Sequence, residues 1–399
     1  MTEAYIFDAL RTPRSSAADS ALYEVRPVQL LAEVFKAMQQ RNALNTSEVD
    51  NAVFGCVTPT DDQGGNIAKA ALLAADWSPK IAAAQLNRSC VSGLDAVLQS
   101  AASIRAGWSQ LAVAGGVESA SRVAANSDGG DLRYDPSLLS QARLLPRGVA
   151  ADLLATLHGF GQSDLDNFAI RSGQKAIFAQ QNNFFARSLV AIKDKNNLSI
   201  LEKDQLSAER NAEDMASMSP IFAEDGAAGF DAMALRKYPF LEKITHAHTS
   251  ANSAKTVDAA AAILLGSLES GKRLELRARA RIVSAATVGG DASALFDGIS
   301  EAVRLALQRA NMDKKNIDLW EINEDFAVVP LLCQRSWSIA EQRLNSCGGA
   351  VTFGHPSGAT GAVLLGTLID ELERQQLKIG LVAMSASGGM GAAMIVERL

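Results

Sequence analysis

Three residue types that can perform acyl transfer occur in distinctive local sequences far apart in the chain. His355, one of four histidines, lies between Gly354 and Pro356 in the run Gly-His-Pro-Ser-Gly. Glycine and proline favour sharp turns and close backbone approach, so this frame can hold an imidazole against a ligand. The alternative is a glycine-rich turn that merely includes a histidine, and this segment alone does not decide between the two.

Cys90 lies between a predicted strand over residues 82–86 and a predicted helix over residues 91–106. Unpaired amides at the start of that helix, together with Arg88, would stabilise a thiolate. The alternative is a structural cysteine, because free cysteines are among the most buried residues. The position at a helix start favours reactivity.

Asn323 and Glu324 follow the apolar segment 317–322. An amide at the end of a strand can hold a water or a carbonyl oxygen by a hydrogen bond. Read alone, the two residues also suit a helix N-cap followed by an acid in the first turn. A cysteine, a histidine and an asparagine together make up a thiol acyl-transfer centre, as nucleophile, base and oxyanion donor.

The elements that must position these residues follow an α/β pattern of short apolar runs and longer amphipathic ones. A polar, irregular stretch from about 121 to 250 indicates an inserted loop-rich region with its own helices, and the α/β pattern resumes after it. Strand, polar residue and helix follow one another at 86–101 and again at 319–333, so the second half repeats the plan of the first. The main predicted segments are strands at 4–7, 53–57, 82–86 and 111–115, helices at 28–40, 66–75, 91–106, 152–158 and 163–182, and later segments at 258–268, 280–286, 297–310, 317–322 and 324–337.

Composition restricts the class of protein. The 399 residues are 48% hydrophobic, enough for a large core divided into two or three domains. A net charge of −6 without any Lys/Arg run argues against a nucleic-acid partner, and no segment resembles a membrane span or secretory signal, so we expect a cytoplasmic protein. Four cysteines without a CxxC pair indicate reduced thiols. His158, His246 and His248 have no matching ligand set, so neither a metal nor a redox cofactor is expected.

Five ordered motifs resemble those of thiolases along the whole chain, and Arg11-Thr-Pro also fits. They are Asn87-Arg-Ser-Cys-Val-Ser-Gly, Gly115-Gly-Val-Glu-Ser, Asn323-Glu-Asp-Phe-Ala, Gly348-Gly-Ala-Val-Thr-Phe-Gly-His-Pro-Ser-Gly-Ala-Thr-Gly and Ser387-Gly-Gly-Met-Gly. The resemblance implies two similar α/β domains in a layered α-β-α-β-α arrangement with an inserted loop domain for coenzyme A. We expect the first domain at 1–120 and 250–270, the loop domain at 121–249 and the second domain at 271–399.

The resemblance also implies a reaction and roles for residues. Cys90 would take up an acyl group, His355 would activate its thiol, and Asn323 would hold the water of one oxyanion hole. The amides of Cys90 and Ser387 would line the other. The acyl group would move between a 3-ketoacyl-CoA or acyl-CoA and coenzyme A, which is a substrate here and not a bound cofactor. A homodimer or homotetramer is implied as well.

Two departures from the family pattern concern the reacting atoms. Ser385 stands where thiolases have a second catalytic cysteine, which moves a proton to or from the acyl acceptor. A hydroxyl is a far weaker acid than a thiol, so we expect this step to slow unless another group replaces the thiol. Cys347 is a candidate replacement, although a packed residue is the better interpretation. Ala254 and Lys255 stand where thiolases have serine and glycine beside the thioester, which would alter affinity.

The remaining substrate contacts are less specific. Phe326 of the third motif is expected to contact substrate. Arg147 stands where acetyl-specific members carry methionine beside the acyl pocket, and it would either bind a polar acyl group or, as we slightly favour, point to solvent. Arg210, Arg236 and Lys237 are candidates for the phosphates of coenzyme A, against the alternative of solvated surface charges.

The missing thiol leaves two other functions open. A condensing or hydrolysing acyl-CoA enzyme would use only Cys90, His355 and Asn323. A catalytically impaired homodimer would bind acyl-CoA without turnover. Thiolysis differs from both because it requires free coenzyme A.

Overall fold

The computed structural model describes residues 2–130, 135–207 and 211–399. Its strands are β1 Tyr5–Arg11, β2 Ser15–Ser16, β3 Asn51–Gly55, β4 Ala82–Leu86, β5 Leu111–Glu118, β6 Ile192–Lys193, β7 Ser199–Leu201, β8 Val257–Gly266, β9 Ala280–Val288, β10 Leu319–Ile322, β11 Ile379–Ser385 and β12 Gly391–Arg398. Its helices are α1 Pro27–Arg41, α2 Ile67–Ala74, α3 Ser92–Arg105, α5 Pro136–Ala142, α6 Arg147–His158, α7 Gln162–Gln181, α8 Ala212–Ala216, α9 Ala223–Asp225, α10 Asp231–Lys237, α11 Leu268–Arg273, α12 Phe296–Ala310, α13 Val328–Trp337, α14 Ala350–Phe353 and α15 Thr360–Arg374.

The two halves of the chain build sheets of the same plan. The strand order is β10-β11-β12-β9-β1-β8-β5-β3-β4, with β2 beside β8. In the first half, β1, β8 and β5 are antiparallel neighbours, and β5, β3 and β4 are parallel. In the second half, β9, β12 and β11 are antiparallel, and β11 and β10 are parallel. The halves meet where β1 pairs with β9 at Tyr5↔Arg281 and Ile6↔Ala280. The mixed α/β class predicted from the sequence is confirmed.

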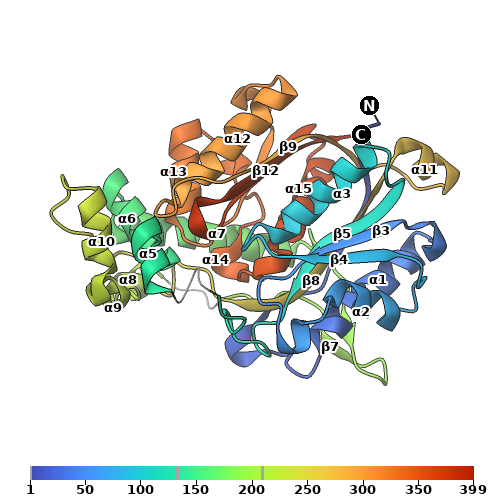
Figure 1. Ribbon diagram of the computed structural model, residues 1–399, viewed down its shortest axis with the longest axis horizontal. Coiled ribbons are helices and arrows are strands. Elements are labelled where there is room, and N and C mark those ends of the chain that lie inside the picture. The colour runs from blue at the N-terminus through green and yellow to red at the C-terminus, as the bar shows by residue number, and fades with distance from the viewer. Residues whose placement is uncertain (1, 131–134, 208–210) are drawn as a thin grey trace.

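Helices form three layers around the two sheet halves. α3 and α15 share one buried cluster with residues of β1, β5, β8, β11 and β12, so both lie between the sheets (Figure 1). α1 and α2 pack on the outer face of the first half, and α12 and α13 pack on the second. α15 is buried from Thr360 to Leu372, as expected for a helix covered on both sides.

The internal repeat differs from the one predicted. The local pattern predicts that the segment β10 to α13 repeats β4 and α3, but its place in the sheet is that of β3 and α2. A single parallel bridge between Trp320 and Leu344 stands where β4 pairs with β3. The counterpart of α3 is therefore α15, the helix that follows His355. The mistake arose because strand order depends on pairing between distant segments, which the local pattern does not contain.

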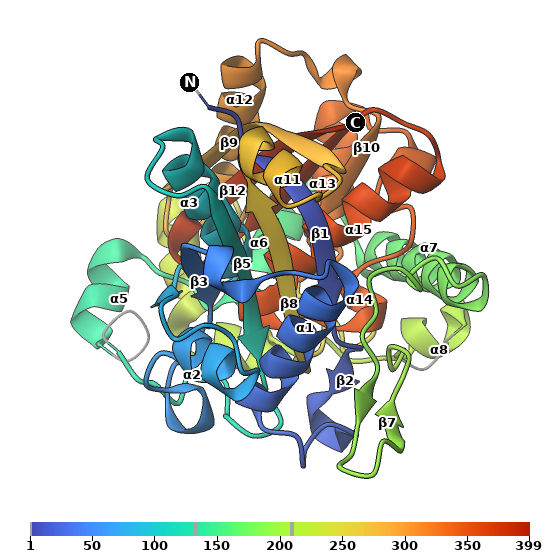
Figure 2. The same ribbon diagram turned by 90° about the vertical axis from the view of Figure 1, so that its right-hand side faces the viewer.

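The inserted region leaves the sheet after β5 and returns at β8. Its helices α5, α6 and α8 to α10 gather at the left of Figure 1. The short hairpin β6-β7 lies beside β2 in Figure 2, and Asp204 just after it pairs with Arg11 and Arg14. The predicted helix at 152–158 begins earlier, at Arg147, which affects the interpretation of that residue below.

The helices of the described residues include none that is both long and apolar enough to cross a membrane.

Candidate active site

A tight turn between β4 and α3 positions Cys90. Ser89 adopts a left-handed conformation with φ of 49°, which is uncommon for a residue with a side chain. Ser92 stabilises this turn, since its Oγ accepts from the amide of Arg88 at 2.8 Å and donates to the carbonyl of Ser89 at 2.6 Å. Cys90 is 8% exposed and lies two residues before the first turn of α3. The sulfur therefore lies at the positive end of a buried helix.

Arg88, predicted to stabilise the thiolate, forms an ion pair with a carboxylate of α3. Its Nε lies 2.8 Å from a carboxylate oxygen of Asp95, and the two form an ion pair. Asp95 lies one helical turn into α3 and is almost fully buried, so it attracts the guanidinium more strongly than a neutral thiol would. The helix start is thus the better supported source of positive potential at Cys90.

The loop before α15 positions His355. Gly354 has φ of 83°, and a Cβ built there would lie 2.0 Å from a methyl carbon of Val257, so this position requires glycine. The His355 amide donates to the carbonyl of Lys255 at 2.8 Å. Its Nδ1 lies 2.8 Å from Oγ1 of Thr360, while buried Nε2 has no hydrogen-bond partner among the described residues. The ring is therefore oriented through one nitrogen and leaves the other available.

Glu118 joins the histidine loop to the half of the chain that carries Cys90. One of its carboxylate oxygens accepts from the amides of Val57 at 3.0 Å and Gly358 at 2.9 Å. A Cβ at Gly116 would lie 1.9 Å from the carbonyl oxygen of Gly358, so β5 and the loop touch through their backbones. Burial raises the pKa of Glu118. Sequence analysis did not identify Glu118, although it lies in the quoted motif Gly115-Gly-Val-Glu-Ser.

These constraints bring Cys90 and His355 together, and Asp325 lies with them. The Cys90 sulfur, a ring nitrogen of His355 and a carboxylate oxygen of Asp325 all lie within 4.8 Å of one another. Two of the three side chains were predicted site residues. Asp325 was not, although it lies in the quoted motif Asn323-Glu-Asp-Phe-Ala and its acidic type was a visible signal.

The electrostatics of the site keep the histidine neutral. Burial of the imidazole, and then the positive charge of Arg147, lower the pKa of His355 to about 3, while Glu118 opposes this shift. A histidine with this pKa is neutral at neutral pH, so one of its two ring nitrogens carries a free lone pair. Nε2, which has no hydrogen-bond partner among the described residues, is the nitrogen that faces a reacting proton when Nδ1 donates to Thr360.

Asn323 lies at the end of β10, as predicted, but the helix after it begins later. α13 starts at Val328, so Asn323 and Glu324 belong to a loop and do not cap a helix. Asn323 is 1% exposed, its Nδ2 lies 3.5 Å from Nδ1 of His355, and its Oδ1 has no hydrogen-bond partner in the described part of the chain. The structure thus places its amide beside the imidazole.

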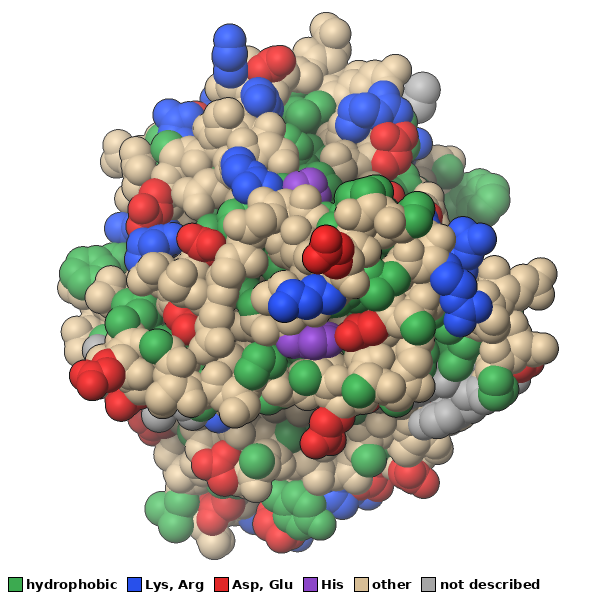
Figure 3. All heavy atoms as spheres, turned by 90° about the vertical axis from the view of Figure 1, so that its left-hand side faces the viewer, with side chains coloured by type: hydrophobic (Ala, Val, Ile, Leu, Met, Phe, Trp, Pro, Cys, Tyr) green, Lys and Arg blue, Asp and Glu red, His purple; other side chains and the backbone are tan. Residues whose placement is uncertain are grey.

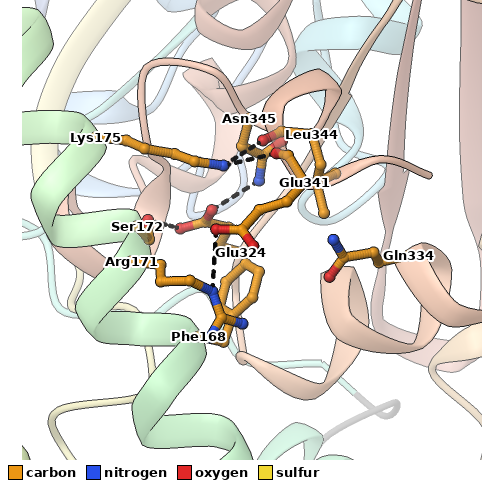
Figure 4. Close-up of a pocket in the computed structure, with 9 residues that line it drawn as sticks. All are labelled: Phe168, Arg171, Ser172, Lys175, Glu324, Gln334, Glu341, Leu344 and Asn345. Atoms are coloured by element: carbon orange, nitrogen blue, oxygen red, sulfur yellow. Dashed lines mark hydrogen bonds and ion pairs between the residues drawn. The ribbon is translucent and has the colours of Figure 1, made fainter.

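Glu324 follows Asn323 and is hydrogen-bonded to groups from several distant segments, and Figure 4 shows two of them, Ser172 and Asn345. One oxygen accepts from Nδ2 of Asn345 at 2.7 Å, and the other accepts from Oγ of Ser172 at 2.7 Å and from the amide of Val351 at 3.3 Å. The side chain is fully buried, and burial raises its pKa. Glu324 is a positioning residue, because these bonds connect α7, the 323–327 loop and α14.

The two C-terminal serines lie at the turn between β11 and β12. Ser385 ends β11, is 1% exposed, and its Oγ makes no hydrogen bond to any described residue. Ser387 lies two residues further on, in the turn before β12. Cys347 is not a replacement thiol, because it packs with Phe185 and Phe353 and burial raises its pKa far above the ordinary value.

Arg147 turns into the site, contrary to the slight preference for solvent. It forms an ion pair with Asp325, and its guanidinium carbon lies 5.9 Å from the centre of the Phe326 ring. Phe326 is 9% exposed and also packs edge-to-face against Phe222 at 5.7 Å. Arg147, Asp325 and Phe326 therefore form one wall beside Cys90. The ion pair joins residues 178 positions apart, which explains why the local sequence did not reveal it.

The predicted coenzyme A contacts are scattered. The Ala254 amide donates to the carbonyl of Asp325 at 2.9 Å, so Ala254 lies at the site. Lys237 pairs with Asp291 and donates to Oγ of Ser293 at 2.8 Å, which engages its charge. Arg236 is exposed on α10, and Figure 3 shows basic side chains mixed with acidic ones at this end of the molecule. Arg210 lies outside the described residues.

A hollow of about 730 Å³ opens between α7, α8 and α14. Lys255 lines it, together with Asn167, Gln174 and Asn211. The residues that line it do not include Cys90, Asn323, His355 or Ser385. This hollow is therefore separate from the cluster around the thiol.

Comparisons with known proteins identify the family of this chain. Residues 4–269 match the family model for the thiolase N-terminal domain, and residues 276–398 match the thiolase C-terminal domain. The 3-ketoacyl-CoA thiolases of Yersinia enterocolitica and Shewanella loihica are each 33% identical, and the matches cover 100% of both chains. The crystal structure of Bacillus anthracis acetyl-CoA acetyltransferase superposes with a TM-score of 0.85 at 28% identity, over 100% of this chain and 99% of that one. The resemblance seen in the motifs is confirmed, and the chain belongs to the thiolase family.

Proposed function

We propose that this protein transfers an acyl group between a 3-ketoacyl-CoA or acyl-CoA and coenzyme A through an acyl-Cys90 intermediate. The observation that carries this proposal is the proximity of the Cys90 sulfur to a neutral His355 ring, within 4.8 Å. A thiol is activated by an adjacent base, and this base has one nitrogen oriented by Thr360 and the other unpaired.

The residues divide the chemistry among them. With its Nδ1 proton donated to Thr360, His355 takes the thiol proton on Nε2, and the sulfur attacks the thioester or keto carbon. The first turn of α3 and the Cys90 and Ser387 amides stabilise the negative oxygen that develops. Asn323 holds the water of the second oxyanion hole. Phe326 and Ala254 bound the acyl and pantetheine region beside the sulfur.

The substrate class rests on the family, because the related proteins are named as 3-ketoacyl-CoA thiolase and acetyl-CoA acetyltransferase. We include a homodimer or homotetramer in the proposal on the same basis. One feature of the sequence favours a second candidate function: residue 385 is a serine where the motif resemblance leads us to expect the second thiol. A condensing or hydrolysing acyl-CoA enzyme would need only Cys90, His355 and Asn323.

The decisive experiment measures cleavage of acetoacetyl-CoA and of a longer 3-ketoacyl-CoA, with and without free coenzyme A. Wild-type protein should form acyl-CoA products only with coenzyme A, and mass spectrometry should detect an acyl group on Cys90. Cys90→Ala should lose both signals. Free acid or carbon dioxide as the product would instead support the second candidate.

A matched control is Cys333→Ala, which removes a buried thiol from α13 in the core of the second half. Its activity per folded molecule should match that of the wild type. Equal loss in the Cys333 and Cys90 variants would contradict a specific role for Cys90.

A further inference from the structure

Asp325 is a buried acid beside Cys90 and His355, and it takes no part in the steps proposed above. It is 6% exposed and lies in the loop between β10 and α13, two residues after Asn323. One of its oxygens lies within 4.8 Å of both the Cys90 sulfur and a His355 ring nitrogen. Hydrogen bonds of catalytic groups tighten when substrate binds, so this spacing is compatible with proton transfer.

The two oxygens of Asp325 differ in one respect, the ion pair with Arg147, which Oδ2 makes. Both oxygens are buried, and neither makes a hydrogen bond to the described residues. Arg147 therefore holds the carboxyl group in place and leaves one oxygen available to a reacting proton. The carbonyl of the same residue accepts from the Ala254 amide at 2.9 Å, which fixes the backbone as well.

One step of the proposed reaction, proton transfer at C2 of the thioester, has no chemically suitable group among the predicted site residues. Breaking or forming the carbon–carbon bond of a 3-ketoacyl thioester requires a proton to reach or leave C2. Ser385 stands at the position of the thiol that does this in thiolases, and a serine hydroxyl does not ionise in the neutral range. Carboxylates do abstract and return protons next to carbonyl groups in enzymes.

We propose that Asp325 is the acid-base catalyst that exchanges the proton at C2 of the thioester, in place of the missing thiol. This inference rests on the proposed function. Arg147 is its positioning residue.

The cleavage reaction balances with one proton that moves among Cys90, His355 and Asp325, and it needs no other proton donor. In the cleavage direction, the Cys90 thiol proton passes to His355 and the sulfur bonds to C3. The C2–C3 bond breaks with its electron pair left on C2, and the proton passes from His355 through the Asp325 carboxylate to C2. Acetyl-CoA leaves, and acyl-Cys90 remains with His355 neutral and Asp325 ionised. Coenzyme A then attacks the acyl group, and its thiol proton returns through His355 to Cys90.

Two reactions of one protein separate this role from a merely structural one. Exchange of labelled coenzyme A with acetyl-CoA requires acyl-Cys90 but moves no carbon-bound proton, whereas cleavage of a 3-ketoacyl-CoA moves one. Asp325→Asn should lower the cleavage rate at least 100-fold, the scale of general acid-base catalysis, and keep exchange within about fivefold. Adding Ser385→Cys to Asp325→Asn should recover at least tenfold of the cleavage rate. EDTA in both assays removes any cation held by these three side chains.

Two further variants control for the loss of any arginine-paired carboxylate and for a failure of Asp325→Asn to fold. Glu301→Gln removes another Arg-paired carboxylate, on the exposed face of α12 beside Arg304, and should leave both reactions unchanged. If Asp325→Asn does not fold, the double variant Arg147→Met/Asp325→Asn removes both charges of the buried pair and should show the same separation of rates.

Several results would overturn the assignment. Cleavage by the Asp325 variants at the wild-type rate would do so, and so would equal loss of exchange and cleavage. Wild-type protein that exchanges coenzyme A but cannot cleave also excludes the role. By contrast, absence of both reactions in wild-type protein, or their persistence in Cys90→Ala, would be a failure of the proposed function itself.

Discussion

Two buried aspartates paired with arginine differ in how many of their hydrogen bonds are made within the protein. Asp204 accepts from Arg11 at 2.8 Å on each oxygen, and from the backbone and side chain of Arg14. Asp325 has an ion pair with Arg147 through one oxygen, and neither of its oxygens accepts a hydrogen bond from a described residue. The first carboxylate has its lone pairs occupied by donors, whereas the second can still receive a proton.

This difference separates a structural charge cluster from a reactive one. The two arginines lower the pKa of Asp204 far below its ordinary value and keep it ionised, so it joins the inserted region to β1 without changing state. Around Asp325, unpaired buried atoms also occur on Asn323, His355 and Ser385. Buried polar atoms are normally paired in folded proteins, so a cluster of exceptions indicates a site that completes its hydrogen bonds with substrate.

The largest effect on stability should come from the structural aspartate. Asp204→Asn leaves two buried arginines with too few acceptors, so we expect the free energy of unfolding to fall by about 3–5 kcal/mol. Urea unfolding followed by circular dichroism measures this. The matched control is Asp62→Asn, which breaks a partly exposed pair with Arg122 and should cost less than about 1 kcal/mol. Similar losses in both variants would remove the distinction.

The next effect is the pH dependence caused by His355. Its folded pKa of about 3 lies below the unfolded value near 6.5, so between these pH values the unfolded chain binds more protons. Stability from this group is complete above pH 6.5 and is lost as the pH falls. We expect the wild type to lose roughly 3 kcal/mol more than His355→Asn between pH 7 and pH 4, by urea unfolding at both values. Parallel losses would mean that folding does not lower the pKa of this imidazole.

Glu324→Gln should have a smaller effect on stability and a clear one on turnover. The NH2 group of a glutamine cannot accept a hydrogen bond. The variant therefore loses either the bond from Asn345 or the bonds from Ser172 and Val351, at a cost of about 1–2 kcal/mol. The Asn323 and His355 loops would shift relative to each other, so kcat should fall roughly tenfold or more while KM changes little. Separate measurement of kcat and KM tests this, and a change confined to KM would argue against a positioning role.

The smallest stability effect should belong to the reactive aspartate. An asparagine at 325 keeps its side-chain oxygen beside Arg147, and only one buried arginine loses its counter-charge, where Asp204→Asn affects two. The free energy of unfolding should therefore fall by about 1 kcal/mol, a third or less of the Asp204→Asn value. The same urea experiment measures it. A loss as large as that of Asp204→Asn would place Asp325 with the structural charges.

Much of the fold and the centre of the site could be predicted because their signals are local. Strand β4 occupies the predicted residues 82–86, and Cys90 follows it before a helix as expected. The glycine and proline frame of His355 does form a tight loop. Local signals failed at Glu324, where acidic residues after a strand suggested a helix start but buried hydrogen bonds to three distant groups hold a loop instead.

The sequence by itself determined the family and the α/β class, and it identified Cys90, Asn323 and His355 as candidate site residues, because these signals lie within short segments. Only the tertiary structure decided the partner of each charge. Arg147 pairs with Asp325 instead of solvent, Arg88 with Asp95 instead of the thiol, and Lys237 with Asp291 instead of a free phosphate site. The physical reason is that the pairing of a buried charge depends on which carboxylate the fold brings within a few ångströms, and packing of segments distant in sequence sets that distance.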